Sequence, residues 1–93
     1  MDIYILDDSV KNVIELFRNV PSMPLKEGDC FEMEVKNQDK EIWVPESGRF
    51  YLEVKSIFNR FVKKYPKSGR VDEIIDDIKI FVYCEIKKRE IYD

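Results

Sequence analysis

Apolar and polar residues alternate along part of this chain, which is the spacing of half-buried β-strands. The clearest stretch is 31–35, where apolar side chains alternate with glutamates. Runs of β-branched and aromatic residues predict three more strands, at 3–6, 42–44 and 79–86. A turn at 37–39 joins the second strand to the third and predicts an antiparallel hairpin, which Pro45 ends.

Other segments have apolar residues three and four positions apart, the spacing of one helical face. The first runs from Ser9 to Pro21 and predicts a helix, with apolar residues Val10, Val13, Ile14, Phe17 and Val20. The second runs from Gly48 to Pro66 and predicts a longer helix, with Phe50, Val54, Ile57, Phe58, Phe61, Val62 and Tyr65. Residues 71–77 predict a short helical turn. Whether 78–93 is strand or helix stays open, because both spacings fit.

The resulting order is β-α-β-β-α-β, which predicts an α/β (α+β) ferredoxin-like sandwich. In that topology an antiparallel sheet carries two helices on one face and leaves its other face open. The chain has 93 residues, so we expect residues 1–93 to form a single small globular domain.

Strand alternation then assigns aromatic side chains to the open face. The candidate binding residues are four aromatic residues with two flanking acids: Tyr4, Trp43, Phe81, Tyr83, Glu32 and Glu34. Exposed apolar patches of this kind mark protein interfaces. Two alternatives remain. Residues 88–93 could cover this face, or a shift of one residue in the third strand would turn Trp43 into the core.

Composition excludes much chemistry. The chain has no histidine, which excludes Ser-His and Cys-His nucleophile pairs and ordinary zinc sites. Cys30 and Cys84 form no CxxC motif, so we expect both thiols to be reduced. No signal peptide or membrane span is recognisable, which favours the cytoplasm. We therefore expect no catalytic residues, cofactor or metal, and no membrane partner.

The formal net charge of -3 conceals a basic segment at 60–70. Its charged residues are Arg60, Lys63, Lys64, Lys67 and Arg70, and they are the candidate contacts to nucleic acid. Four acids follow within residues 72–77 and oppose that interaction. A basic last turn is also common where a helix ends.

Asp7 and Asp8 follow the first predicted strand. This placement resembles the small metal-dependent nucleases of CRISPR spacer acquisition, which have the ferredoxin-like fold and an Asp at the end of their first strand. The resemblance implies a cation held by carboxylates. Acids at such a position are also common helix caps, and the sequence leaves both roles open.

These observations favour a small acidic, non-enzymatic protein-binding module that acts through an aromatic sheet face, either alone or as a homodimer. Inhibitors, immunity proteins and accessory proteins of prokaryotes or viruses are often small acidic proteins, and this analogy is the basis for naming them here. The expected partner is a protein with a basic surface, or a second copy. A nucleic-acid-binding regulator that uses 60–70 is the second hypothesis, and a carboxylate nuclease is the third.

Overall fold

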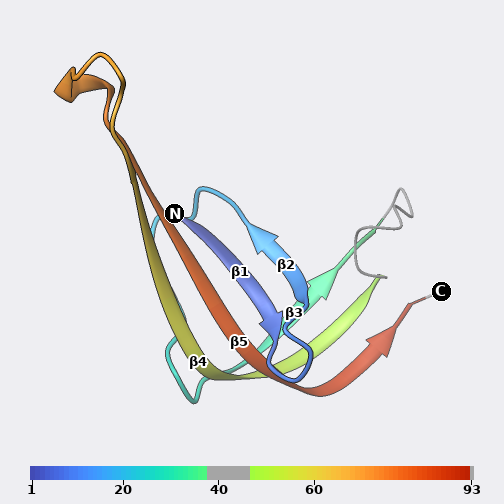
Figure 1. Ribbon diagram of the computed structural model, residues 1–93. Coiled ribbons are helices and arrows are strands. Elements are labelled where there is room, and N and C mark those ends of the chain that lie inside the picture. The colour runs from blue at the N-terminus through green and yellow to red at the C-terminus, as the bar shows by residue number, and fades with distance from the viewer. Residues whose placement is uncertain (38–46, 93) are drawn as a thin grey trace.

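The computed structural model describes residues 1–37 and 47–92, and in them the regular structure is almost entirely β (Figure 1). Five strands form one sheet: β1 (Asp2–Asp7), β2 (Val13–Phe17), β3 (Cys30–Val35), β4 (Gly48–Lys64) and β5 (Ile75–Ile91). A single 3-10 turn, η1 (Val71–Glu73), precedes β5.

The strands lie in the order β2-β1-β5-β4-β3. β1 runs parallel to β5, and the other neighbouring pairs are antiparallel. β4 and β5 are 17 residues each and pair along almost their whole length, whereas β1 and β3 each pair with only part of this hairpin. The long hairpin is therefore the central element of the sheet.

The predicted ferredoxin-like sandwich is wrong. It requires two helices on one face of the sheet, and the described residues contain no α-helix. Its strand order would be 4-1-3-2, in which the two edge strands are the second and the last; here the last strand, β5, lies at the centre of the sheet. Strands at 3–6 and 31–35 are confirmed as β1 and β3. The strand predicted at 42–44 lies outside the described residues.

The helix predicted from Ser9 to Pro21 is also wrong, because this segment turns back and forms β2 beside β1. The turn contains Lys11 with φ of 59°, a left-handed conformation that interrupts any helix. Only Ile14 of the apolar stripe is buried, and Val13 and Phe17 are exposed. The β-branched and aromatic residues that fit helical spacing here are equally suited to a strand.

The helix predicted from Gly48 to Pro66 is instead β4. Its first half has strict alternation, in which Phe50, Leu52 and Val54 are buried and the residues between them are partly exposed. The helical stripe omitted Leu52, which is the most telling residue of that alternation. The short helix predicted at 71–77 is replaced by η1 and the beginning of β5, and β5 settles residues 78–91 as strand.

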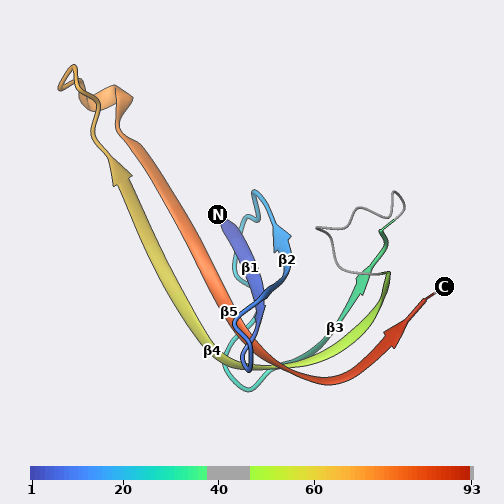
Figure 2. The same ribbon diagram turned by 45° about the vertical axis from the view of Figure 1, so that its right-hand side comes forward.

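The sheet curls into a half-barrel whose inner face carries the hydrophobic core (Figures 1 and 2). The register of β4 against β5 shifts at Tyr51/Leu52 and at Val54/Ser56. Such β-bulges bend strands and increase their twist, which accounts for the curl. The core comes from β1, β3, β4 and β5 with Ile14 of β2, and parts of the loop between β2 and β3 pack against it.

Beyond the second bulge the hairpin leaves the rest of the sheet and projects as a two-stranded ribbon (Figures 1 and 2). We call residues 56–79 the arm. Its strands are Ser56 to Lys64 of β4 and Ile75 to Lys79 of β5, and the arm helps to extend the molecule to 52 Å along its longest axis. No helix long and apolar enough to cross a membrane occurs in the described part of the chain.

Candidate functional site

A row of aromatic rings crosses the outer face of the sheet where the arm begins. Tyr4 of β1 lies opposite Phe81 of β5, which lies opposite Phe58 of β4. The rings of Tyr4 and Phe81 are stacked with centroids 4.9 Å apart, and those of Phe58 and Phe81 are tilted with centroids 6.3 Å apart. Ring pairs at such distances attract one another beyond the area that they bury. We call these three residues the aromatic row.

The aromatic row ends at an uncovered edge of the sheet. β3 pairs with β4 only as far as Glu53, and the outer edge of Val54 bonds to the backbone of Gly28 and Asp29. Within the ranges that the structure describes, no strand pairs with the outer edge of β4 from Ser56 onward. Phe58 stands at this edge and is 58% exposed. An exposed strand edge is a template for another strand.

The other residues expected on this face lie at different distances from the row. Tyr83 lies two residues beyond Phe81 on β5, and Lys11 lies 4.9 Å from its ring centroid. Glu32 and Glu34 are on β3, at the far edge of the sheet, and form ion pairs with Arg49 and Lys36. The structure thus groups Tyr4, Phe81 and Tyr83 and places the two glutamates elsewhere. Trp43 lies outside the described residues.

The arm carries further exposed apolar side chains. Phe61 is 75% exposed, Tyr65 71% and Val71 78%. Because side chains alternate along a strand, Phe58 and Phe61 lie on opposite faces of the arm. Both faces of the ribbon therefore present apolar surface to solvent.

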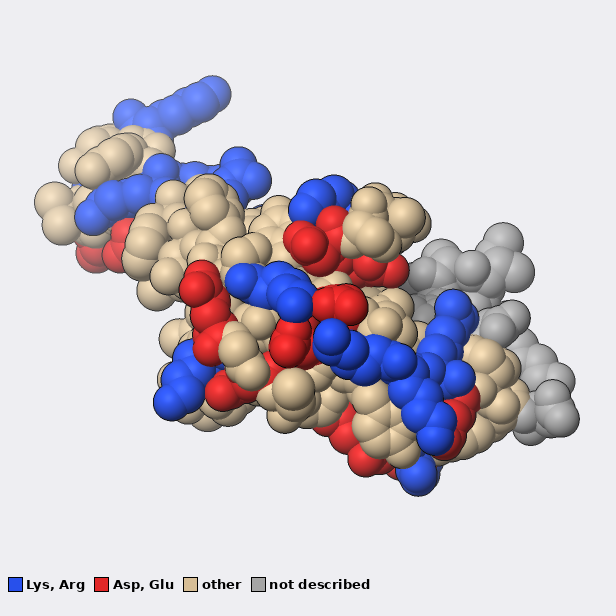
Figure 3. All heavy atoms as spheres, turned by 90° about the horizontal axis from the view of Figure 1, so that it is seen from below, with Lys and Arg blue, Asp and Glu red and all other residues tan. Residues whose placement is uncertain are grey.

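The basic residues predicted as nucleic-acid contacts also lie on the arm and its tip. Lys63 forms an ion pair with Asp76 at 3.6 Å, and Arg70 with Asp72 at 3.5 Å. Arg60, Lys64 and Lys67 form no ion pair with the residues described. Figure 3 shows lysine and arginine gathered at the projecting end. Residues 56–79 contain six bases and four acids, whereas the rest of the chain contains ten bases and fifteen acids, so the arm is positive and the body negative.

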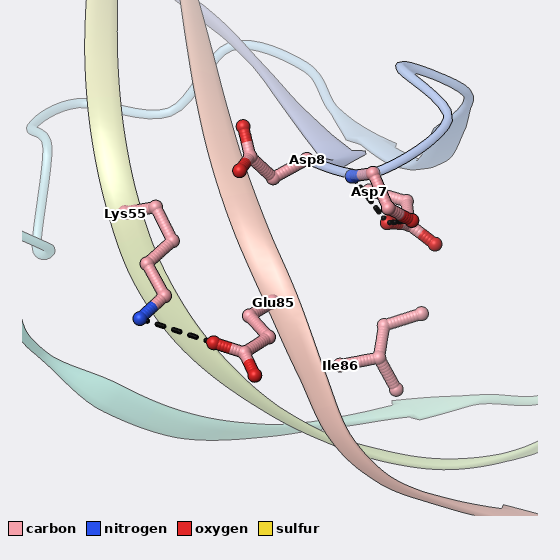
Figure 4. Close-up of a pocket in the computed structure, with 6 residues that line it drawn as sticks. Asp7, Asp8, Lys55, Glu85 and Ile86 are labelled. Carbon is pink, nitrogen blue, oxygen red and sulfur yellow. Dashed lines mark hydrogen bonds and ion pairs between the residues drawn. The ribbon is translucent and has the colours of Figure 1, made fainter.

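Asp7 and Asp8 line a polar hollow of about 290 Å³ together with Ser9, Lys55, Glu85 and Ile86 (Figure 4). The two aspartate side chains point in different directions, and Glu85 points toward Lys55. Each carboxylate already has a donor in the protein: Ser9 for Asp7, Lys11 for Asp8 and Lys55 for Glu85. No group of three or more acids or cysteines in the described ranges could hold a metal ion.

The Asp7 carboxylate closes the turn after β1. It accepts hydrogen bonds from the Ser9 hydroxyl at 2.7 Å and from the Ser9 amide at 2.9 Å. These bonds, the hydroxyl's first, hold the pKa of Asp7 below its usual value. The lowered pKa means that Asp7 contributes stability above the pKa that it has in the unfolded chain, and that this contribution is lost as the pH falls through its folded pKa.

Replacing Ser9 by alanine is therefore expected to raise the pKa of Asp7 toward its ordinary value and to make acid unfolding less steep. Carboxyl chemical shifts followed by NMR between pH 2 and 6 measure this pKa directly. Ser56→Ala, on the exposed edge of β4, is the control and leaves the titration of Asp7 unchanged. An Asp7 titration that is identical in wild type and Ser9→Ala would contradict the assignment.

A second charged group occupies the outer face between the polar hollow and β3. Lys55 forms ion pairs with Glu53 and Glu85, and Lys87 lies 3.2 Å from Glu85. Hydrogen bonds from Lys55 are the first cause that lowers the pKa of both glutamates. These side chains satisfy one another, whereas Phe58 and Phe61 of the arm stay largely exposed.

A shallow apolar hollow of about 250 Å³ opens on the inner face. Ile3, Ile5 and Met33 form its floor, and residues of the loop between β2 and β3 form its rim. It is continuous with the core and contains a single charged lining residue, Glu32.

The sequence missed Phe58 and Phe61 as surface residues, because the helical stripe assigned both to a buried face. The alternation from Arg49 to Val54 was the signal that could have identified this segment as a strand, although it ends at the bulge before Phe58. No protein-family model, curated protein or solved structure matches this chain.

Proposed function

We propose that this chain is a non-enzymatic protein-binding module, of the inhibitor, immunity or accessory type, and that it binds with the arm and the aromatic row. The observation that carries the proposal is the exposure of Phe58, Phe61, Tyr65 and Val71, between 58% and 78%, on a ribbon that projects from the sheet. Exposed apolar groups gathered on one projecting element support an interface.

The construction of the arm supports the same proposal. A two-stranded hairpin is marginally stable alone in water, because neither of its faces is covered. Beyond Ile57 and Ile78, which touch the core, the arm has little of its own to bury. A bound partner would cover these faces and order the arm.

Charge favours a protein over nucleic acid as the partner. Phosphate binding depends on several uncompensated bases. The arm has bases along β4, but Asp76 and Asp72 each pair with one of the five residues of the 60–70 segment, and two more acids follow in the same stretch. A protein surface with an apolar centre and an acidic rim fits this mixture better. The expected partner charge is thus the reverse of the one inferred from Glu32 and Glu34, which lie apart from the row.

The test is site-specific photo-crosslinking in the cells that produce the protein. The photo-reactive residue benzoyl-phenylalanine replaces Phe61 in one variant and Phe17 in the control. Phe17 is also aromatic and 44% exposed, but it lies on β2 at the other edge of the sheet. We expect a discrete protein adduct from position 61 that persists after nuclease treatment and is at least about tenfold weaker from position 17.

Adducts that nuclease removes would instead identify the arm as a nucleic-acid contact and overturn the proposal. Equal labelling from positions 61 and 17 would overturn it as well, because it would show that contact does not depend on the arm.

A further inference from the structure

We infer that a second copy of this chain pairs with the uncovered edge of β4, so that two copies form one continuous sheet about a two-fold axis at Phe58. The inference rests on the proposed function, because it takes the apolar surface at the root of the arm to be a protein contact. It goes further in naming the partner of this edge and the register of pairing.

The edge available for pairing begins at Ser56. At Val54 the outer edge of β4 is already bonded to Gly28 and Asp29, so a second strand can begin at Ser56. Antiparallel pairing centred on Phe58 then sets Ser56 opposite Arg60 of the second copy and Ile57 opposite Asn59. Five residues from each copy pair, and the remainder of each arm continues past its neighbour.

This register continues the aromatic row through the dimer. Residues directly opposite in antiparallel strands lie on the same face, with Cβ atoms about 4.5–5.5 Å apart. Phe58 of each copy would therefore meet its equivalent, and the row would run from Tyr4 through Phe81 and Phe58 into the same three rings of the second copy. Six rings would then cross six strands, and the pairing would cover the exposed β4 edge of each copy.

Charge opposes registers that are centred further along the arm. A two-fold axis at Arg60 would place the two Arg60 side chains directly opposite. An axis at Phe61 would place Arg60, Lys63 and Lys64 of both copies within one paired segment. Like charges opposite one another destabilise strand pairs. The axis at Phe58 sends the bases of each arm in opposite directions, toward the side of the other copy that carries Asp29 and Glu53.

Charge on the unpaired part of the arm also supports the contact. Beyond the five paired residues each arm continues along the other copy, and the negative body of that copy offers complementary charge to the bases of the arm. The two contacts are identical by symmetry, as an isologous dimer requires.

Light scattering coupled to gel filtration tests the dimer on the purified chain. We expect wild type to have twice the monomer mass of 11.2 kDa. Phe58→Lys puts two ammonium groups opposite each other and is expected to weaken the dimer by at least about tenfold. Phe17→Lys is the matched control: it also changes an exposed phenylalanine, 44% against 58%, but one on β2 at the opposite edge of the sheet, so its dimer persists.

Disulfide trapping tests the register. Cys30 is exposed and is first replaced by serine. Cys84 can stay, because burial raises the pKa of its thiol to about 11 and keeps it protonated. In this background Phe58→Cys is expected to form a dimer on mild oxidation, since facing residues have the Cα spacing that a disulfide needs. Phe61→Cys is expected to remain largely monomeric, and a mixture of Ser56→Cys and Arg60→Cys chains to form the mixed dimer.

Three results would overturn the inference. They are a monomer at all concentrations up to about 1 mM, a dimer that Phe58→Lys leaves intact, and trapping at Phe61 in preference to Phe58. A monomer that still gives the Phe61 photo-adduct to another protein would remove the dimer alone. A dimer without any such adduct to another protein would confine the proposed function to self-association.

Discussion

Replacing Leu52 by alanine is expected to lower the free energy of unfolding by about 2–5 kcal/mol. Leu52 is 1% exposed and lies at the centre of β4, between Phe50 and Val54 on the inner face of the sheet. Its removal leaves a cavity among neighbours that come from several strands and cannot all collapse. A chain of this size has a total stability of roughly 5–14 kcal/mol, so the loss is a large fraction of it.

Phe61→Ala is the control for this prediction. Phe61 is the larger side chain, but it is 75% exposed on the same strand, and its replacement should change the stability by no more than about 0.5 kcal/mol. Urea unfolding followed by circular dichroism measures both variants, at a protein concentration at which light scattering shows one species. The opposite ranking, with Phe61→Ala the more damaging, would support a helix at Gly48–Pro66 and contradict β4.

The segment that contains Leu52 and Phe61 shows why the fold class was not predictable from the sequence. Two periods compete in residues 50–65. The helical one joins Phe50, Val54 and Phe61, and the period-two one joins Phe50, Leu52 and Val54. A bulge at Val54/Ser56 shifts the alternation by one residue, and past it apolar residues stand on both faces of the arm. The run thereby takes on helical spacing although residues 50–64 all lie in a strand.

The short strands were predictable for a different reason. β1 and β3 are bounded by polar or turn residues and contain a single regular alternation or a compact β-branched run, with no bulge between β3 and β4 to disturb it. The segment at β2 was not, because only tertiary pairing with β1 decides between strand and helix for residues that suit both. The order of strands in the sheet depends on pairing between segments far apart in the sequence. The spacing of apolar residues within one segment does not indicate which strands pair.

For the candidate site too, the sequence predicted local features and missed those that depend on the order of strands. Tyr4 and Phe81 were expected on one face because alternation within each strand fixes the face of each residue, and the structure stacks them. Their neighbour Phe58 could not be added, since it was placed in a helix. Glu32 and Glu34 share the outer face but not the neighbourhood, because the order of strands sets distance across a sheet and alternation does not.

The second large effect is expected at Gly48, the first residue of β4. It is buried and pairs with Val35 on one side and Ile91 on the other. A Cβ at this position would overlap the backbone carbonyl oxygen of Glu90, and backbone atoms cannot rotate away as a side chain can. Gly48→Ala is therefore expected to cost about 1–3 kcal/mol, the usual cost of overpacking.

The damage should be greatest where β4 meets the end of β5. The amide of Tyr92 donates to the carbonyl of Ser47 at 2.9 Å, and displacement of the Glu90 backbone would break this bond. We expect Gly48→Ala to lower the urea midpoint and to accelerate hydrogen exchange of the Tyr92 amide. Gly69→Ala is the matched control, because a Cβ there meets nothing within 4 Å and only its φ of +73° opposes alanine, at about 1–2 kcal/mol. That cost falls at the tip of the arm and leaves Tyr92 exchange unchanged, so equal acceleration in both variants would contradict the close approach at Gly48.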